Sequence, residues 1–215
     1  MSDTVLSFVL AVIQGLTEFL PISSSAHLLL PSLLFGLNDL GLSFDIAVHA
    51  GTLIAVIYYF RKEIALMFKS LVLSDENLLP HRNLAISLIV ATIPIILAGL
   101  FVKDFIDERV FNIEHIAIAN IIFAGILLFA YLKRKDIKNL YSVTLYSALF
   151  VGVFQSLALF PGASRSGTAI TAALLLGFNL KDASKFSFML GIPTIFGALV
   201  LLIIEMQSTL EAFNY

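Results

Sequence analysis

Two short polar segments interrupt an otherwise apolar chain and hold its most reactive side chains. The first polar segment is QGLTEFLPISSSAH, from Gln14 to His27, and the second is FQSLALFPGASRSG, from Phe154 to Gly167. The first contributes the carboxylate of Glu18 and the imidazole of His27, two groups that can carry protons. The second contributes the guanidinium of Arg165, whose planar fork of donors fits the oxygens of a phosphate. Together the two segments predict chemistry on an anion.

Glu18 and Arg165 stand out because each is isolated in an apolar stretch. An ionisable residue in such a stretch is a functional candidate, since a charge inside a membrane is expensive. Arg165 is the only charge between Lys138 and Lys181. Two interpretations are open for it: a buried ion pair with Glu18 that locks the two segments together, and a fork that binds phosphate oxygens. Both hold if the ion pair belongs to the empty state and phosphate replaces it.

The other candidates are hydroxyl groups and a few polar side chains near them. Hydroxyls that could bind phosphate or attack it are carried by Ser23, Ser24, Ser164, Ser166 and Thr168. Backbone N–H groups around Ser164 to Thr168 could form a cradle for an anion. His27 is either a proton carrier or a structural partner of a neighbouring hydroxyl. Gln14 and His49 could line the same cavity, and for His49 packing or helix capping is an equal alternative.

Composition predicts a membrane protein. Of 215 residues, 59% are hydrophobic and 13% are charged, and the mean hydropathy is +0.98. These values exclude an ordinary soluble domain. The formal net charge of −2 leaves no basic surplus for a nucleic-acid partner. The absence of cysteine excludes disulfides, thiolate metal sites and cysteine nucleophiles.

The apolar windows define the expected elements of an all-α integral membrane protein with a single membrane domain, residues 1–215. A spanning helix needs about 20 mostly apolar residues. Repeat one, residues 1–135, is expected to hold a hairpin at 4–35 and spans at 44–60, 84–102 and 113–132. Repeat two, residues 141–215, is expected to hold a hairpin at 141–177 and one span at 184–204. The repeat is inferred from the shared order of Gln, Leu, Phe, Pro and Ser in the two polar segments.

The positions of the positive charges decide between two membrane topologies, in which 141–177 is either a full span or a re-entrant hairpin. One expected loop carries Arg61, Lys62, Lys69 and Arg82, and another carries Lys133, Arg134, Lys135 and Lys138. The positive-inside rule places both loops in the cytoplasm. Lys181 and Lys185 then stay inside only if 141–177 is a re-entrant hairpin rather than a full span. By the same logic 4–35 enters from the outer face, so the two polar segments are expected to meet near mid-membrane with inverted topology.

The same motifs resemble a known family. QGLTEFLPISSSAH, FDIAVHAGTLIAVIYYFRKEI from Phe44, FPGASRSG, and KFSFMLGIP from Lys185 are similar to segments of the integral membrane undecaprenyl-diphosphatases, the BacA/UppP type linked to bacitracin resistance. The resemblance covers nearly the whole chain. It implies an inverted repeat, its second half truncated here, in which two re-entrant helix pairs meet at the active site. It also implies removal of the terminal phosphate from a C55 polyprenyl diphosphate, which regenerates the monophosphate lipid carrier for cell-envelope glycan synthesis.

The resemblance also assigns roles by position. The functional residues that it implies are Glu18, Ser24, His27, Ser164, Arg165 and Ser166, with Thr168 offset by one from a threonine of the family. It implies a divalent cation, Mg²⁺ or Ca²⁺, with Glu18 as a ligand. Gln14 stands where some members carry Glu, so a site with two glutamates is not expected here. Two helices of a full second repeat are missing, which predicts a short member, a gene fragment, or a chain completed by another subunit.

The expected mechanism uses Ser24 as nucleophile and His27 as base, while Arg165 and nearby N–H groups bind the diphosphate. Attack by His27 itself, or by water directly, is an open variant. The expected partners are a polyprenyl diphosphate and the lipids of the plasma membrane, which the chain crosses several times, with a homodimer as one candidate assembly and no nucleic acid. The main alternative is a polyprenyl-phosphate transporter or flippase, which needs the anion site but no nucleophile. A third alternative is a member that binds substrate but has lost turnover.

Overall fold

The computed structural model describes residues 2–107 and 112–212, and every long element in these ranges is a helix. The α-helices are α1 (Asp3–Thr17), α2 (Ser24–Phe35), α3 (Gly41–Tyr59), α4 (Arg61–Val72), α5 (Leu79–Asp107), α6 (Ile113–Lys133), α7 (Leu145–Ser156), α8 (Arg165–Leu175) and α9 (Leu180–Ala212). Short 3-10 turns lie at Glu76–Leu78, Leu140–Ser142 and Leu157–Leu159. Within the described ranges the only β-type pairing is one isolated bridge between Lys138 and Phe178. The all-α expectation is confirmed.

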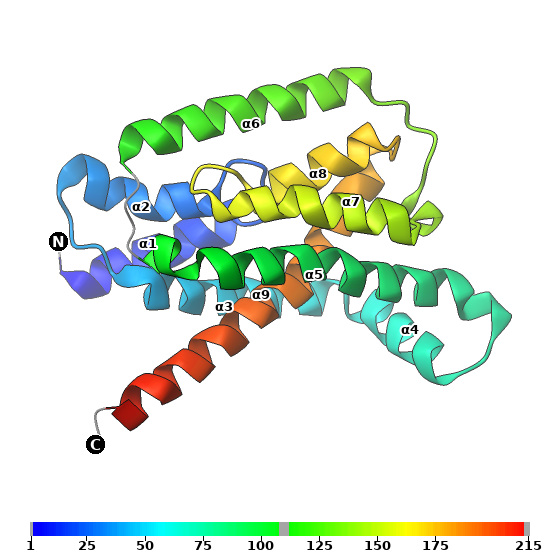
Figure 1. Cartoon of the computed structure of the whole chain (residues 1–215), viewed down its shortest axis with the longest axis horizontal. Helices are drawn as coiled ribbons and strands as arrows, with labels where there is room; N and C mark the ends of the chain where they lie inside the picture. The colour runs from blue at the N-terminus through cyan, green and yellow to red at the C-terminus, as the bar shows by residue number, and fades with distance from the viewer. Residues whose placement is uncertain (1, 108–111, 213–215) are drawn as a thin grey trace.

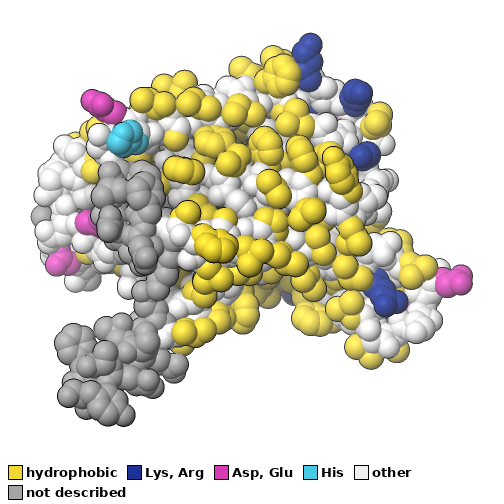
Figure 2. All heavy atoms as spheres, viewed as in Figure 1, with side chains coloured by type: hydrophobic (Ala, Val, Ile, Leu, Met, Phe, Trp, Pro, Cys, Tyr) yellow, Lys and Arg dark blue, Asp and Glu magenta, His cyan; other side chains and the backbone are white. Residues whose placement is uncertain are grey.

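Three helical stretches are long and apolar enough to cross a membrane, judged by length and composition: Glu76–Val102, Ile113–Lys133 and Leu180–Leu201. The pair α3 and α4 would make a fourth if it is one span, bent by 75°. Hydrophobic side chains cover most of the face seen in Figure 2, as expected for a surface that contacts lipid. The expectation of several membrane-capable helices is therefore confirmed for the described part of the chain.

The helix α4 differs from the sequence expectation, which placed residues 61–83 in a cytoplasmic loop. The structure forms a helix over Arg61–Val72, which buries Met67 and Ser70 on one side and turns most of its charged residues outward. This is the pattern of an amphipathic helix, with apolar positions recurring once per turn. Counting uninterrupted apolar runs misses such a helix because its charges interrupt every run.

Two pairs of short helices carry the polar segments. The helices α1 and α2 are separated by residues 18–23, here called break one, and α7 and α8 by residues 157–164, here called break two. The second helix of each pair begins after a serine cap, Ser23 or Ser164, whose hydroxyl accepts a hydrogen bond from a backbone N–H of that helix. Such caps satisfy donors that a helix start leaves free. Ser23 does so from a left-handed backbone conformation, with φ at 61°, which is uncommon outside glycine.

The helix α8 lies among α6, α7 and α9, and α7 packs in turn on α5 (Figure 1). Residues 166–174 of α8 are all buried. Gly152 allows α7 to approach α5 so closely that a Cβ there would collide with the backbone of Ala91. Close packing of this kind leaves a buried helix little freedom to shift. The first residue of α8, Arg165, is therefore held at a fixed place inside the bundle.

Candidate active site

Glu18 sits where α1 ends and is buried, with 4% of its surface exposed. Its Oε2 accepts a hydrogen bond from Gln14 Nε2 at 2.8 Å, across one helical turn. The same oxygen accepts a second from Ser24 Oγ at 2.7 Å, across break one. Gln14 was expected as a possible cavity-lining residue, but it is fully buried and contributes a hydrogen bond to Glu18 instead of a place in the cavity lining. Glu18 thus joins the last turn of α1 to the first turn of α2.

Arg165 approaches the other carboxylate oxygen from α8. One terminal guanidinium nitrogen lies 2.7 Å from Glu18 Oε1, and Nε lies 3.3 Å from the same atom. The two side chains are 3% and 13% exposed, so the pair is shielded from water. Of the two interpretations of Arg165 from the sequence, the structure shows the ion pair with Glu18. A buried ion pair of this kind persists only when the remaining donors and acceptors are also satisfied.

His49 is the third group on this carboxylate. Its Nε2 lies 3.2 Å from Glu18 Oε2, and its Nδ1 is hydrogen-bonded to the backbone carbonyl of Asp45, one turn earlier in α3. Because a carbonyl oxygen can only accept, Nδ1 must carry a hydrogen. From the sequence, lining the cavity and packing or helix capping were equal alternatives for His49. The structure places it against Glu18.

Glu18, Arg165 and His49 all line a cavity of about 190 Å³. Its lining residues are Glu18, Ser23, Ser24, Ser25, Ile46, His49, Ile95, Ala158, Ala163, Arg165, Thr194, Ile195 and Ala198. Thr194 was not found from the sequence, because it stands in the long apolar run of α9. Its hydroxyl donates to the Leu190 carbonyl at 2.9 Å and accepts from Gln155 Nε2 at 3.3 Å. The cavity lining therefore includes a hydroxyl from α9 in addition to the polar groups around Glu18.

The two breaks meet at the backbone carbonyl of Leu20. Ser166 Oγ donates to this oxygen at 2.9 Å, and Ser164 Oγ lies 3.4 Å from it. The two hydroxyls are also 3.1 Å apart. A carbonyl in break one is thus satisfied by hydroxyls at the start of α8, as a buried backbone acceptor requires. Ser166 is fully buried in this contact and does not line the cavity.

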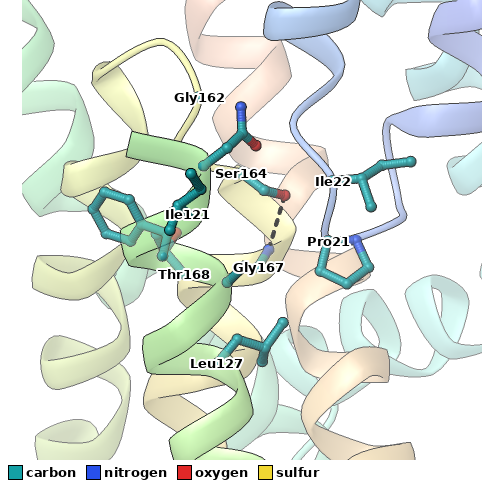
Figure 3. A pocket seen from close by; sticks show the side chains of 11 residues that line it. Pro21, Ile22, Ile121, Leu127, Gly162, Ser164, Gly167 and Thr168 are labelled. Carbon is teal, nitrogen blue, oxygen red and sulfur yellow. Dashed lines mark hydrogen bonds between the residues drawn. The ribbon is translucent and has the colours of Figure 1, made fainter. Parts of the chain in front are cut away.

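The predicted phosphate-binding residues are therefore divided between two places. Ser23 and Arg165 line the cavity, whereas Ser164 and Thr168 line a second, more apolar hollow of about 280 Å³. In Figure 3 this hollow lies between Pro21 and Ile22 on one side and Ile121 and Leu127 of α6 on the other. Figure 3 also shows the hydrogen bond from Gly167 N to Ser164 Oγ, at 3.1 Å. Thr168 donates its hydroxyl to the carbonyl of Arg165 at 3.0 Å, so it stabilises the helix start.

No hydrogen bond joins His27 to Ser24, the expected nucleophile, in the described part of the chain. Its Nδ1 donates to the carbonyl of Ser23 at 2.8 Å, which ties it to its own helix. Among the described residues, the hydrogen bond of Ser24 Oγ goes to Glu18 and not to His27. The partner of His27 is thus a backbone carbonyl and not the neighbouring hydroxyl that the structural alternative expected. A role of His27 as the base for Ser24 is not supported by this arrangement.

The donor set does not fit a resident divalent cation. Within the described ranges, no three His, Asp or Glu side chains gather in a way that could hold a metal ion. Glu18 is the only carboxylate in the cavity lining, and both its oxygens already accept hydrogen bonds. A cation bound by protein alone would have to displace these donors beside a guanidinium, whereas Mg²⁺ and Ca²⁺ require several oxygen ligands.

Residues 7–214 match the family described as "Bacitracin resistance protein BacA". The chain belongs to this family. A relative from Saccharophagus degradans named "Undecaprenyl-diphosphatase" is 51% identical over 190 residues, which cover 86% of this chain and 71% of the relative. A second, "Undecaprenyl-diphosphatase 1" from Pseudoalteromonas translucida, is 48% identical over 191 residues, with 87% and 71% covered. The family resemblance of the motifs is confirmed, and the BacA-family chain is a helical membrane protein.

The buried ion pair should matter more for stability than a partly exposed one in the same bundle. Arg165→Ala leaves Glu18 buried without its guanidinium, and we expect a loss of about 3–5 kcal/mol. The matched control is Lys185→Ala, because Lys185 pairs with Glu63 at 2.8 Å with both side chains more than a quarter exposed. That control should cost about 1 kcal/mol or less. Thermal unfolding in detergent measures both, and equal losses would contradict the central role of the buried pair.

Proposed function

We propose that this protein is an undecaprenyl-diphosphate phosphatase, a hydrolase that removes the terminal phosphate of a membrane-embedded polyprenyl diphosphate. The observation that carries the proposal is the cavity in which a carboxylate, a guanidinium and several hydroxyls converge between two broken helix pairs. Two relatives at about half identity bear the name undecaprenyl-diphosphatase. A cavity inside an apolar bundle suits a substrate whose reactive head is charged and whose tail stays in lipid.

Arg165 is proposed to bind the terminal phosphate. In the structure its guanidinium is hydrogen-bonded to Glu18. A phosphate offers several charged oxygens and can take over one or more of these donors, since guanidinium groups bind phosphate through parallel hydrogen bonds. The exchange releases Glu18 from its strongest partner. The same exchange brings the phosphorus next to the hydroxyl that Glu18 already holds.

Ser24 is the proposed nucleophile, with Glu18 as the proton acceptor. Ser24 Oγ already donates to Glu18 Oε2 at 2.7 Å, the geometry that a general base requires. Attack forms a bond between Oγ and the terminal phosphorus and breaks the bridging P–O bond, so the polyprenyl monophosphate leaves and Glu18 holds the proton. Water then hydrolyses the phosphoserine to inorganic phosphate. In this scheme Glu18 replaces His27 as the base.

A divalent cation, Mg²⁺ or Ca²⁺, remains part of the proposal. Because the described residues do not fit a resident ion, we propose that the cation binds together with the diphosphate, whose oxygens supply most of its ligands. Glu18 is the nearest carboxylate to such a complex. The ion would supply neutralisation of the diphosphate charge.

The membrane arrangement proposed is an inverted repeat in the plasma membrane, with α1–α2 and α7–α8 as re-entrant hairpins that enter from opposite faces. Each pair consists of helices of 11 to 15 residues. A helix of that length is shorter than the bilayer core, which needs about 20 residues. The contact of both breaks at the Leu20 carbonyl supports a meeting point inside the membrane.

Single cysteines test this topology, because the natural chain has none. We expect Asn38→Cys, between α2 and α3, to react with a membrane-impermeant maleimide added outside intact cells. Lys181→Cys, just after α8, should react only after the membrane is opened, as should the control Lys135→Cys. If Lys181→Cys is labelled from outside while Lys135→Cys is protected, α7 and α8 cross the membrane and the hairpin proposal fails.

Phosphate release in detergent tests the function. The purified 215-residue chain should release inorganic phosphate from a polyprenyl diphosphate, and Arg165→Ala should abolish the release because the phosphate loses its guanidinium. A chelator should lower the rate, and added Mg²⁺ or Ca²⁺ should restore it. Detergent micelles have no two sides, so turnover there excludes a transporter as the explanation. Substrate binding without any release would favour the transporter or the member without turnover.

Trapping a phosphorylated enzyme tests the nucleophile. We expect rapid quenching to leave phosphate on Ser24, and Ser24→Ala to lose both the adduct and about 10²-fold or more of the turnover. Ser25→Ala is the matched control: its hydroxyl is also in the cavity lining but contacts Ser23 Oγ at 3.2 Å rather than Glu18. A phosphate found on His27, or no adduct with full turnover in Ser24→Ala, would contradict the assignment to Ser24.

A further inference from the structure

Gly191 lies directly behind the guanidinium of Arg165. It is a buried residue of α9, in the motif KFSFMLGIP. A Cβ placed on Gly191 would lie 2.7 and 2.8 Å from the two terminal guanidinium nitrogens and 3.0 Å from the carbon between them. These distances are well inside the contact distance of a methyl carbon, since carbon atoms pack best near 3.5–4.0 Å. The guanidinium therefore occupies the space that a side chain at residue 191 would fill.

The turn of α9 before Gly191 holds the same group from another side. The carbonyl of Ser187 accepts a hydrogen bond from a terminal nitrogen of Arg165, at 3.4 Å. The hydroxyl of Ser187, which is fully buried, donates to the carbonyl of Ser166 at 3.2 Å. The segment Ser187–Gly191 thus contacts both the head of Arg165 and the first turn of α8. We call this segment the guanidinium seat.

We propose that Gly191 is a positioning residue that directs the Arg165 guanidinium toward Glu18 and the cavity. Arg165 is a long side chain with many rotamers, and an arginine aims its fork of donors at an anion only if something fixes its direction. The ion pair with Glu18 fixes the direction of the Arg165 side chain in the structure. When phosphate replaces Glu18, the seat remains and keeps the donors pointing into the cavity. The catalytic consequence rests on the proposed phosphatase function, whereas the seat itself rests on the contacts.

The collision at Gly191 is unlike that at Gly152, where a Cβ would strike the backbone of Ala91. Here the obstructed atoms are the far end of a flexible side chain. A methyl group at residue 191 would displace the guanidinium and leave α9 in place. Gly191→Ala is therefore expected to damage the site without unfolding the bundle.

Activity measurements compare Gly191→Ala with a matched control on the same helix. Gly197→Ala is that control, because a Cβ there would meet only Ile96, at 3.4 and 3.7 Å, in ordinary contact. We expect Gly191→Ala to lower kcat/KM by about tenfold or more, with a raised KM because the displaced guanidinium binds the diphosphate less well. Gly197→Ala should keep wild-type values. Equal kinetics of the two variants would overturn the proposal.

A double-mutant cycle on thermal stability tests the seat without any activity. In the wild-type background Gly191→Ala should lower the unfolding midpoint, because it weakens the pair between Arg165 and Glu18. In the Arg165→Ala background the obstructed group is gone, so the same substitution should raise the midpoint by about 2–4 °C, the gain from replacing glycine by alanine inside a helix. The change of sign identifies Arg165 as the target of Gly191. The same sign and size in both backgrounds would overturn the seat, whereas an absent phosphatase activity would overturn only the proposed function.

Discussion

A carboxylate and a guanidinium buried side by side in an apolar bundle determine much of this structure. Glu18 and Arg165 are 147 positions apart in the chain, yet their charged groups lie 2.7 Å from each other. Neither charge could be left alone at this depth without a cost of several kcal/mol. The pair therefore requires α1 to end where α8 begins, which brings breaks one and two together.

The neighbours of the pair complete the hydrogen bonding of the Glu18 carboxylate. Gln14, Ser24 and His49 occupy one carboxylate oxygen, and Arg165 occupies the other. Ser166 in turn satisfies a carbonyl of break one. The result is a buried ion pair whose carboxylate also accepts a hydrogen bond from the hydroxyl of Ser24. In the proposed function, phosphate competes for the donors of Arg165, which are already in place.

The sequence predicts site residues best where a single charged residue stands in an apolar stretch. Glu18 and Arg165 could be predicted because an isolated charge in an apolar stretch needs a partner, and the family motifs around them are specific. The helical class followed from long apolar runs. His49 was only a candidate, since nothing in α3 shows which way the ring turns. Gln14 has no such signal either, except its place one turn before Glu18.

Other features depend on three-dimensional contacts that spacing does not encode. Ser164 and Thr168 belong to the same motif as Arg165, but they line the second hollow instead of the cavity. The ring of His27 turns back to its own helix. The roles of Thr194 and Gly191 depend on the side chains that they contact, Gln155 and Arg165, which lie far from them in the sequence. The helix α4 could not be predicted from apolar runs because charged residues interrupt them. For these residues the sequence shows the type of side chain but not the direction in which it points.

The central claim is that Glu18 and phosphate compete for the guanidinium of Arg165. Equilibrium binding of a methylene-bridged, non-hydrolysable diphosphate analogue to Glu18→Gln tests it most directly, with Glu63→Gln as control. Because the competing charge is removed, the account predicts that Glu18→Gln binds the analogue about tenfold more tightly, a change of about 1.4 kcal/mol, while turnover of the true substrate is lost. Weaker or unchanged binding by Glu18→Gln would contradict it.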